Sequence, residues 1–554
     1  MSFTKEAEVQ ALIRNILWAF LAAICMPATL TASDADIHGV VTDTAGKPVR
    51  GAMIKASAGG KTVARFTQTD GHYEIMLPPG SYTLTVEAYG FASKQKTIET
   101  TQSGETNFSL TPKFDLTHLT SAELETLLPD DPPTRFVTAA CVTCHSFGNI
   151  RRRSGYTASA WQTFIPVMPL GRLPAPDFTP VTLAALCQAL EKDFGPSARY
   201  FGPDSDPPKP EQVRHADLSN EVLNATIREY TVPTGPDSMP HSILIDAHGD
   251  AWFGERGLRA NKITRFEVGP EKFDEYPAPH PHTGVLGKDG LIWMTLTNGP
   301  DLASVDPATG KVTTYNIPNR KSGTHTLAMD SAGNIWCSGS SVWKFDVKKK
   351  EFKEYNVPLP ATFPENSVKN WDQVPGQPPA HLDPNGTFYD IKVDSKDKVW
   401  VSVFAYGELI RIDPVTEETK VYHAPDSPSI RGLEVDAQDN VWFASFNGNS
   451  LGKLDPGTGT FTMYHPPTRF AMPYGIAADK KTGKIWFADL NGNNISRLDP
   501  NTGEFTEFPI PSDNAAPRFI GLDSKGRVWF TEWMNGKIGV VDPGDTGKQS
   551  SSMR

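Results

Sequence analysis

Several features that would define a function are missing from this sequence. Acidic residues outnumber basic ones, 64 to 53, and the net charge of −11 argues against a nucleic-acid binder. No glycine-rich phosphate-binding motif marks a nicotinamide or flavin site. Only five cysteines are present, and the single C-x-x-C at 141–144 has no second pair. Only one long apolar run occurs, so no membrane span is expected after residue 33.

That apolar run lies at the N-terminus. Lys5 and Arg14 precede NILWAFLAAICMPATL, and small residues and then acidic residues follow. This order predicts a signal peptide over residues 1–33, cleaved near Ala32 or Ser33. The alternative is an uncleaved anchor. The mature protein is expected in the periplasm or secreted, and not as an integral membrane protein.

Residues 36–112 alternate apolar and polar side chains between turn signals such as Asp70-Gly71 and Pro79-Gly80. This alternation predicts a small antiparallel β-sandwich. The stretch TDGHYEIMLPPGSYTLTVEAYGF resembles the carboxypeptidase regulatory-like family, which has a transthyretin-like fold. The resemblance implies an accessory module that binds a glycan or a partner protein.

Residues 113–200 are predicted to be mainly helical, and residues 201–225 to form a linker. Thr120 and Glu123 have the spacing of a capping box at a helix start. In VTLAALCQALEKDFGP, one helical face carries apolar side chains, and Gly195-Pro196 ends the helix. That face consists of Leu183, Leu186, Cys187 and Leu190.

The sequence CVTCH at 141–145 lies within this helical segment. A zinc site would need two more ligands at similar spacing, and a thioredoxin-like dithiol would need a βαβ setting. C-x-x-C-H instead predicts one covalent haem c, with thioethers from Cys141 and Cys144 and His145 as the proximal iron ligand. Cys187 and Cys337 stand singly in apolar contexts and are predicted to be buried small hydrophobes.

Met168 in VMPL is the candidate for the distal haem ligand. The alternative is a core position, because Trp161, Phe164, Ile165 and Met168 form a helical stripe. The segment resembles the mono-haem cytochrome c domains attached to exported quinoprotein-type dehydrogenases. The resemblance implies electron transfer to a redox partner protein, which residues 151–153, all arginine, could help to dock; a solvated helix face is the alternative.

Residues 226–545 repeat. One tryptophan marks each repeat: Trp252, Trp293, Trp336, Trp400, Trp442, Trp486 and Trp529. A period of about 42 residues with four strands per unit predicts a seven-bladed β-propeller. Residues 228–233, REYTVP, supply the strand that completes the last blade. A proline-rich insertion at 359–386 lengthens one repeat and is either a lid or disordered.

Counting five residues back from each turn after the innermost strand places seven side chains around one channel mouth. They are His241, His282, His325, Tyr389, Arg431, Tyr474 and Arg518. Three residues after the tryptophan, some blades carry carboxylates that we expect at the same opening: Glu255, Asp489 and Glu532. This set predicts a site for a small molecule, metal or partner; a water-filled channel is the alternative. His241 is the candidate general base, with Glu255 orienting it or holding a cation.

The propeller resembles the virginiamycin B lyase-like family, visible in MPHSILIDAHGDAWFGE and RVWFTEWMNGKIGVVDP. The family includes lyases that open the ester-closed ring of streptogramin B antibiotics with a histidine base and a magnesium ion held by glutamates. His241 and Glu255 match two of those four positions. Met239 and Arg518 replace the other two, a glutamate and a histidine.

A second alignment takes His282 as the base and His241 as the histidine one blade earlier. His280 and Leu296 then replace both glutamates. Either alignment puts the lyase chemistry and the Mg²⁺ site in doubt, since a shared fold does not carry its function with it.

These expectations combine into a mainly β, multidomain chain with a sandwich, a short all-α cytochrome c domain and a propeller. The primary prediction is an exported c-type cytochrome whose propeller binds a small molecule or partner at its mouth. One alternative is a C–O lyase that opens a cyclic ester by elimination. Another is a non-enzymatic scaffold that binds carbohydrate or a partner.

Overall fold

The computed structural model describes residues 34–544, with gaps at 115, 130, 132–141, 143–145, 166–182, 203–207, 210–211, 214, 258, 298, 319–322, 358–387, 405–406 and 428. The predicted signal peptide and the 359–386 insertion lie outside the described residues, as do Cys141, Cys144, His145 and Met168. Within the described ranges, no helix is both long and apolar enough to cross a membrane.

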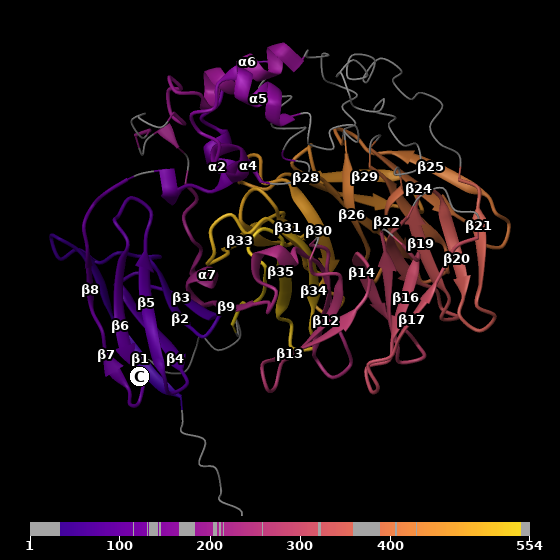
Figure 1. Ribbon diagram of the computed structural model, residues 1–554, viewed down its shortest axis with the longest axis horizontal. Coiled ribbons are helices and arrows are strands. Elements are labelled where there is room, and N and C mark those ends of the chain that lie inside the picture. The colour runs from indigo at the N-terminus through magenta and orange to yellow at the C-terminus, as the bar shows by residue number, and fades with distance from the viewer. Residues whose placement is uncertain are drawn as a thin grey trace, which may run out of the picture.

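The N-terminal domain is a β-sandwich of two sheets (Figure 1). One sheet contains β1(Ala35–Asp43), β4(His72–Leu77), β7(Gly104–Glu105) and β8(Phe108–Leu110). The other contains β2(Met53–Ala58), β3(Lys61–Phe66), β5(Ser81–Glu87) and β6(Lys94–Glu99). Alternate residues of each sheet fill the core between them, which includes Val41, Ile54 and Leu84.

The prediction of a purely antiparallel sandwich is wrong at one edge. β7 and β8 pair with β1 in the parallel direction. After β6 the chain crosses back from the second sheet and reaches β1 running the same way. A crossover of this kind cannot be read from the alternation of apolar residues, because that pattern does not encode strand direction.

The propeller contains seven four-stranded antiparallel units, with one tryptophan in the second strand of each. The first three are β10(Pro240–Ile245), β11(Ala251–Glu255), β12(Lys262–Glu267) and β13(Lys272–Pro277); β14(Pro281–Leu286), β15(Ile292–Leu296), β16(Leu302–Val305) and β17(Val312–Tyr315); β18(Thr324–Met329), β19(Ile335–Gly339), β20(Val342–Asp346) and β21(Glu351–Tyr355).

The next three are β22(Phe388–Val393), β23(Val399–Val403), β24(Glu408–Ile412) and β25(Thr419–His423); β26(Ile430–Val435), β27(Val441–Ser445), β28(Ser450–Asp455) and β29(Thr460–Tyr464); β30(Pro473–Ala478), β31(Ile485–Asp489), β32(Asn494–Leu498) and β33(Phe505–Pro509). The innermost strand of each blade contacts that of the next, and β34 contacts β10, so the ring is closed.

The seventh blade joins the two ends of the propeller. β34(Pro517–Leu522), β35(Val528–Glu532) and β36(Lys537–Asp542) are followed in the sheet by β9(Thr226–Thr231). Tyr230 lies opposite Ile538 in the antiparallel β9–β36 pair, which confirms the predicted closing strand. On its other side β9 pairs with β3 of the sandwich. The seventh blade and one sandwich sheet therefore form one continuous sheet of eight strands.

A helical segment covers one end of the propeller (Figure 1). Its described elements are η1(Leu116–His118), α2(Ser121–Glu125), α4(Phe147–Arg151), α5(Ala158–Phe164) and α6(Leu183–Phe194). The capping box is confirmed, because Glu123 N donates to Thr120 Oγ1 and Thr120 N donates to Glu123 Oε2. Leu186, Cys187 and Leu190 are buried, as predicted.

Two short helices complete the description, α7(Asn220–Asn224) before β9 and η5(Gly235–Ser238) after it. The core of the helical segment is continuous with the channel mouth. Phe147, Trp161 and Phe194 belong to the same buried cluster as Tyr389 and Tyr474 of the propeller. The helical segment therefore covers the end of the propeller at which the sequence predicts the channel mouth.

Candidate functional site at the channel mouth

The seven predicted mouth residues occupy equivalent places in the structure. Each is the second residue of its innermost strand. In every blade the innermost strand pairs with the second strand, and the register of this pairing shifts between the first and fourth residues of the innermost strand. In the first blade these residues are Pro240 and Ile243. A shift of this kind frees the second and third residues from regular pairing and re-aims their side chains. The sequence count therefore identified a real structural layer.

Three histidines from consecutive blades stand beside one another in this layer. The ring centroids of His241 and His282 are 3.9 Å apart, and those of His282 and His325 are 4.2 Å apart. His325 Nδ1 lies 2.7 Å from the carbonyl oxygen of Tyr389, so this nitrogen carries the proton and donates. Both nitrogens of His282 lack a hydrogen-bond partner among the described residues.

Two tyrosines and two arginines complete the ring. The Tyr389 and Tyr474 hydroxyls share a short hydrogen bond. Arg431 donates to the Tyr389 hydroxyl at 2.7 Å, and Arg518 donates to the Tyr474 hydroxyl at 2.9 Å. Arg518 also lies 3.4 Å from His241 Nε2, which closes the circle of contacts. The structure thus brings all seven predicted side chains together. This set of contacts is the mouth ring.

Six of the seven ring side chains are buried, His325 is partly buried, and Arg431 and Arg518 place positive charge among them. Burial, followed by the neighbouring histidines and Arg256, holds the pKa of His241 and of His282 well below the ordinary value. Burial lowers the pKa of His325 to about 3. Burial opposes ionisation of Tyr474, yet Arg518 and Arg431 lower its pKa overall. Neutral histidines beside guanidinium groups are the arrangement that an anion would stabilise.

The predicted carboxylates do not join this ring. Glu255 accepts a hydrogen bond from Thr264 Oγ1 at 2.5 Å, and Asp489 accepts one from Ser496. Glu532 accepts one from Asn535. Each of these residues ends a second strand, opposite the first residue of the innermost strand. They therefore lie at the predicted end of the channel. Their side chains face neighbouring parts of the blades because only the bulged inner strand turns residues toward the axis.

The position of the Glu255 side chain affects two predictions, the role of His241 as a general base and the binding of magnesium at the mouth. His241 Nδ1 has no hydrogen-bond partner among the described residues, so the predicted pair with Glu255 is not formed. Burial raises the pKa of Glu255, which disfavours its charged form. Across the described ranges no group of three or more histidine, cysteine, aspartate or glutamate side chains is arranged to hold a metal. The described mouth therefore does not fit a magnesium site.

Two asparagines that the sequence reasoning missed attach the helical segment over the mouth. Asn491 Oδ1 accepts the Phe147 N–H at 3.0 Å, and Asn491 Nδ2 donates to Glu125 Oε2 at 2.8 Å. Asn514 Oδ1 accepts from the Ser146 hydroxyl. Both asparagines lie in turns between strands, where asparagine is common for local reasons. Nothing in the sequence separates these two from the other turn asparagines.

Two described residues at the CVTCH motif are apolar and buried. The Cys141, Cys144 and His145 side chains lie outside the described residues. Val142 within the motif and Phe147 just after it are both fully buried. They pack in an apolar cluster with Trp161, Leu186 and other side chains. An apolar surrounding of this kind is what excludes water from a haem and tunes its potential.

Comparison with known families identifies two parts of the chain. A sequence model of the virginiamycin B lyase family matches residues 380–550. A model of the carboxypeptidase regulatory-like domain matches residues 36–112. A comparison with curated proteins finds no match. Residues 36–112 are therefore similar to the carboxypeptidase regulatory-like domain, and residues 380–550 of the propeller are similar to the virginiamycin B lyase family.

Several solved structures are similar to the propeller part. A streptogramin B lyase is 23% identical, with 58% of this chain and 99% of that chain covered and a TM-score of 0.49. A virginiamycin B lyase from Staphylococcus aureus is 21% identical, with 57% and 99% covered and a TM-score of 0.49. The extracellular domain of a hybrid two-component system from B. thetaiotaomicron is 16% identical, with 56% and 40% covered and a TM-score of 0.43.

Proposed function

We propose that the protein is an exported c-type cytochrome whose helical segment carries one covalent haem and exchanges electrons with a redox partner protein. The observation that carries this proposal is the CVTCH motif, in which Val142 is buried in the same apolar cluster as Phe147 just after it. Cys141 and Cys144 would hold the haem covalently, and His145 and Met168 would be its iron ligands. When bound, the haem supplies a one-electron redox centre.

This chain's own residues shape the environment of that centre. Val142, Phe147 and Trp161 exclude water from the cluster. Asn491 and Asn514 fix the segment that follows the motif against the propeller loops. The proposed redox centre would therefore be attached to the end of the propeller that carries the mouth ring.

The test is expression of the full chain in cells that attach haem covalently. Intact-mass measurement should show the mass of one haem, and the double variant Cys141→Ala/Cys144→Ala should lose it. His145→Ala should keep the mass but change the absorption spectrum, because only the iron ligand is removed. Wild-type protein without a covalently bound haem would refute the proposal.

We further propose that the mouth ring binds a small anion, which would be the substrate or effector of the propeller. Arg518 and Arg431 lower the pKa of Tyr474, and Arg256 contributes to the lowered pKa of His241. Among the described residues, the two buried nitrogens of His282 have no side-chain hydrogen-bond partner, although buried polar groups ordinarily find hydrogen bonds. A carboxylate or another oxyanion would complete these interactions.

Acetate is the probe for this site, with ethylamine as the cationic control. Calorimetric titration of the full-length protein should detect acetate and not ethylamine. His282→Phe keeps a ring of similar shape but removes both nitrogens, and it should weaken acetate binding about tenfold. Equal binding of acetate by the wild type and by His282→Phe would show that the mouth ring is not the anion site.

A C–O lyase acting on a cyclic ester is the second candidate, favoured by the family match over residues 380–550. His241 and Glu255 are the residues that would carry it, but the Glu255 carboxylate is bonded to Thr264. The test is incubation of the haem-loaded protein with magnesium and a streptogramin B antibiotic, followed by mass spectrometry. A linear product that His241→Ala abolishes would place the lyase first.

A further inference from the structure

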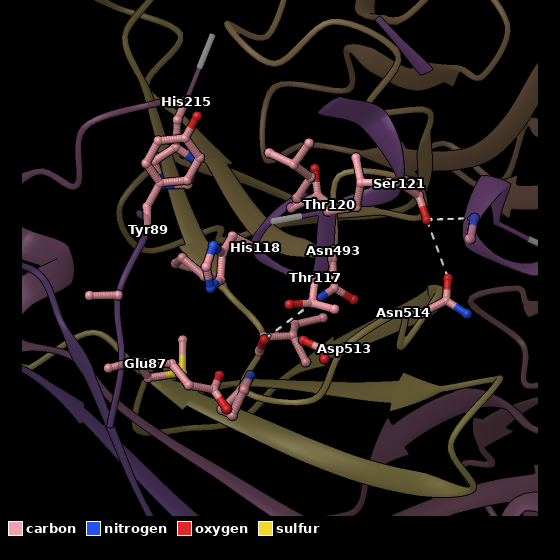
Figure 2. Close-up of a pocket in the computed structure, with 18 of the residues that line it drawn as sticks. Glu87, Tyr89, Thr117, His118, Thr120, Ser121, His215, Asn493, Asp513 and Asn514 are labelled. Carbon is pink, nitrogen blue, oxygen red and sulfur yellow. Dashed lines mark hydrogen bonds between the residues drawn. The ribbon is translucent and has the colours of Figure 1, made fainter. Parts of the chain in front are cut away.

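A cavity lies where three parts of the chain meet, and none of the mouth-ring residues lines it (Figure 2). Its volume is about 510 Å³. The sandwich contributes Glu87 and Tyr89, the helical segment contributes His118, and the loop before the seventh blade contributes Asp513. The volume is within the range of small-molecule sites, which commonly form where domains meet.

Much of the cavity wall is apolar and held in place. Phe91, Leu116, Leu218 and Ile510 line it. The Tyr89 ring stacks on His215 with centroids 4.0 Å apart and planes 8° apart. Because the wall comes from separate domains already packed together, little ordering would be needed when a ligand enters.

Asp513 is an exposed acidic residue that lines this cavity. Among the described residues its carboxylate makes no hydrogen bond or ion pair, although its backbone carbonyl accepts from Asn535. Loss of hydration nevertheless raises its pKa, partly offset by Lys55. A ligand that offers a hydrogen-bond donor would satisfy this carboxylate.

The charges around the cavity favour an uncharged ligand. Glu87, Asp513, Arg151 and Arg152 all line the cavity, and their formal charges cancel. Glu87 already forms an ion pair with Lys55 at 2.6 Å. A sugar would press several hydroxyl groups against leucine, isoleucine and proline side chains, which costs free energy unless each finds a partner. An aromatic ring with one hydroxyl avoids that cost.

We propose that this cavity is a binding site for a small uncharged aromatic alcohol, a phenol or naphthol, whose hydroxyl donates to the Asp513 carboxylate. The ring of the ligand packs on Phe91, Leu116 and Ile510. The site is separate from the mouth ring, and it does not require the haem.

The experiment is calorimetric titration of the full-length protein with 2-naphthol and with its methyl ether, 2-methoxynaphthalene. The ether has nearly the same shape but no donor. Naphthol should bind, and the ether should bind at least tenfold more weakly. Asp513→Ala should weaken naphthol binding about tenfold, because a hydrogen bond to a charged group is lost. Asp237→Ala is the matched control at an exposed aspartate and should have no effect.

Ser93→Trp gives an independent check, because Ser93 is exposed and lines the cavity, so the indole should block it without touching Asp513. Naphthol binding should then disappear, while His282→Phe in the mouth ring should leave it unchanged. Absence of naphthol binding to wild type would overturn the proposal. Equal binding of the ether would overturn the role of Asp513. Binding of 2-naphthylmethylamine or maltose in place of naphthol would show that the ligand class is wrong.

Discussion

At the scale of single residues, the mouth ring combines histidines that stay uncharged with tyrosine hydroxyls that share hydrogen bonds. Three neighbouring histidines are neutral because burial and nearby guanidinium groups oppose protonation. The seven positions could be predicted because the turn after each innermost strand fixes the count. Whether a carboxylate would join them could not be predicted, because the direction of Glu255 depends on Thr264 in the next strand.

The histidines should make the protein less stable in acid. The pKa of folded His325 is about 3, below the ordinary value of 6.5, so the unfolded chain takes up a proton first as pH falls. The free energy of unfolding should therefore fall between pH 6.5 and 3, by at most about 1.4 kcal/mol per pH unit for this group. His325→Asn should flatten that slope in thermal unfolding measured from pH 4 to 7. The exposed His248→Asn should leave it unchanged; a parallel slope in His325→Asn would contradict the assignment.

Glu532 should have the opposite effect. Burial, and then Glu229 beside it, raises its pKa well above the usual 4.5. As pH rises above 4.5 the unfolded chain releases this proton before the folded chain does, so stability falls with increasing pH. Glu532→Gln should therefore be more stable than wild type at pH 8, by roughly 1–3 kcal/mol. Chemical unfolding at pH 5 and pH 8 measures the difference, with the exposed Glu504→Gln as control. A gain of equal size at pH 5 would argue against titration as the cause.

At the scale of elements, the strands of the propeller could be predicted from the sequence more completely than the strands of the sandwich. Trp252, Trp336 and Trp400 each donate their indole N–H to the aspartate at the preceding turn, which locks strand and turn together. That repeated pair made the blades predictable from sequence. The parallel strands β7 and β8 were not predictable, because no repeated contact records which way the chain returns.

The innermost strands approach so closely that a side chain cannot fit between some of them. At Gly475, directly after Tyr474, an added Cβ would lie 2.4 Å from the carbonyl oxygen of Arg518. Gly475→Ala should push β30 away from β34 and weaken the Tyr474–Arg518 contact, with a loss of about 1–3 kcal/mol. Thermal unfolding measures the loss, and Gly269→Ala, where an added Cβ meets nothing, is the control. Unchanged stability would mean that the strands can separate without cost.

At the scale of the whole molecule, the sandwich and the propeller are joined through a shared sheet and not by a linker alone. β9 closes the propeller on one side and pairs with β3 of the sandwich on the other. Without the sandwich, β9 would be an exposed edge strand of the seventh blade. Its pairing with β3 covers that edge. Sequence patterns could predict the sandwich and the propeller but not this shared sheet, because the apolar and polar alternation of a strand does not show which domain's strand will pair with it.

Asn491 should control whether the helical segment remains attached over the mouth ring. Its buried side chain accepts from Phe147 and donates to Glu125, and Asn491→Ala leaves both groups without these partners at a cost of about 1–3 kcal/mol each. Hydrogen exchange should therefore become faster in α4 and α5, while exchange in blades one to three stays at the wild-type rate. Asn501→Ala, at an exposed turn, is the matched control. Faster exchange throughout the propeller would instead show that Asn491 stabilises the blades, and that the helical segment does not open independently of them.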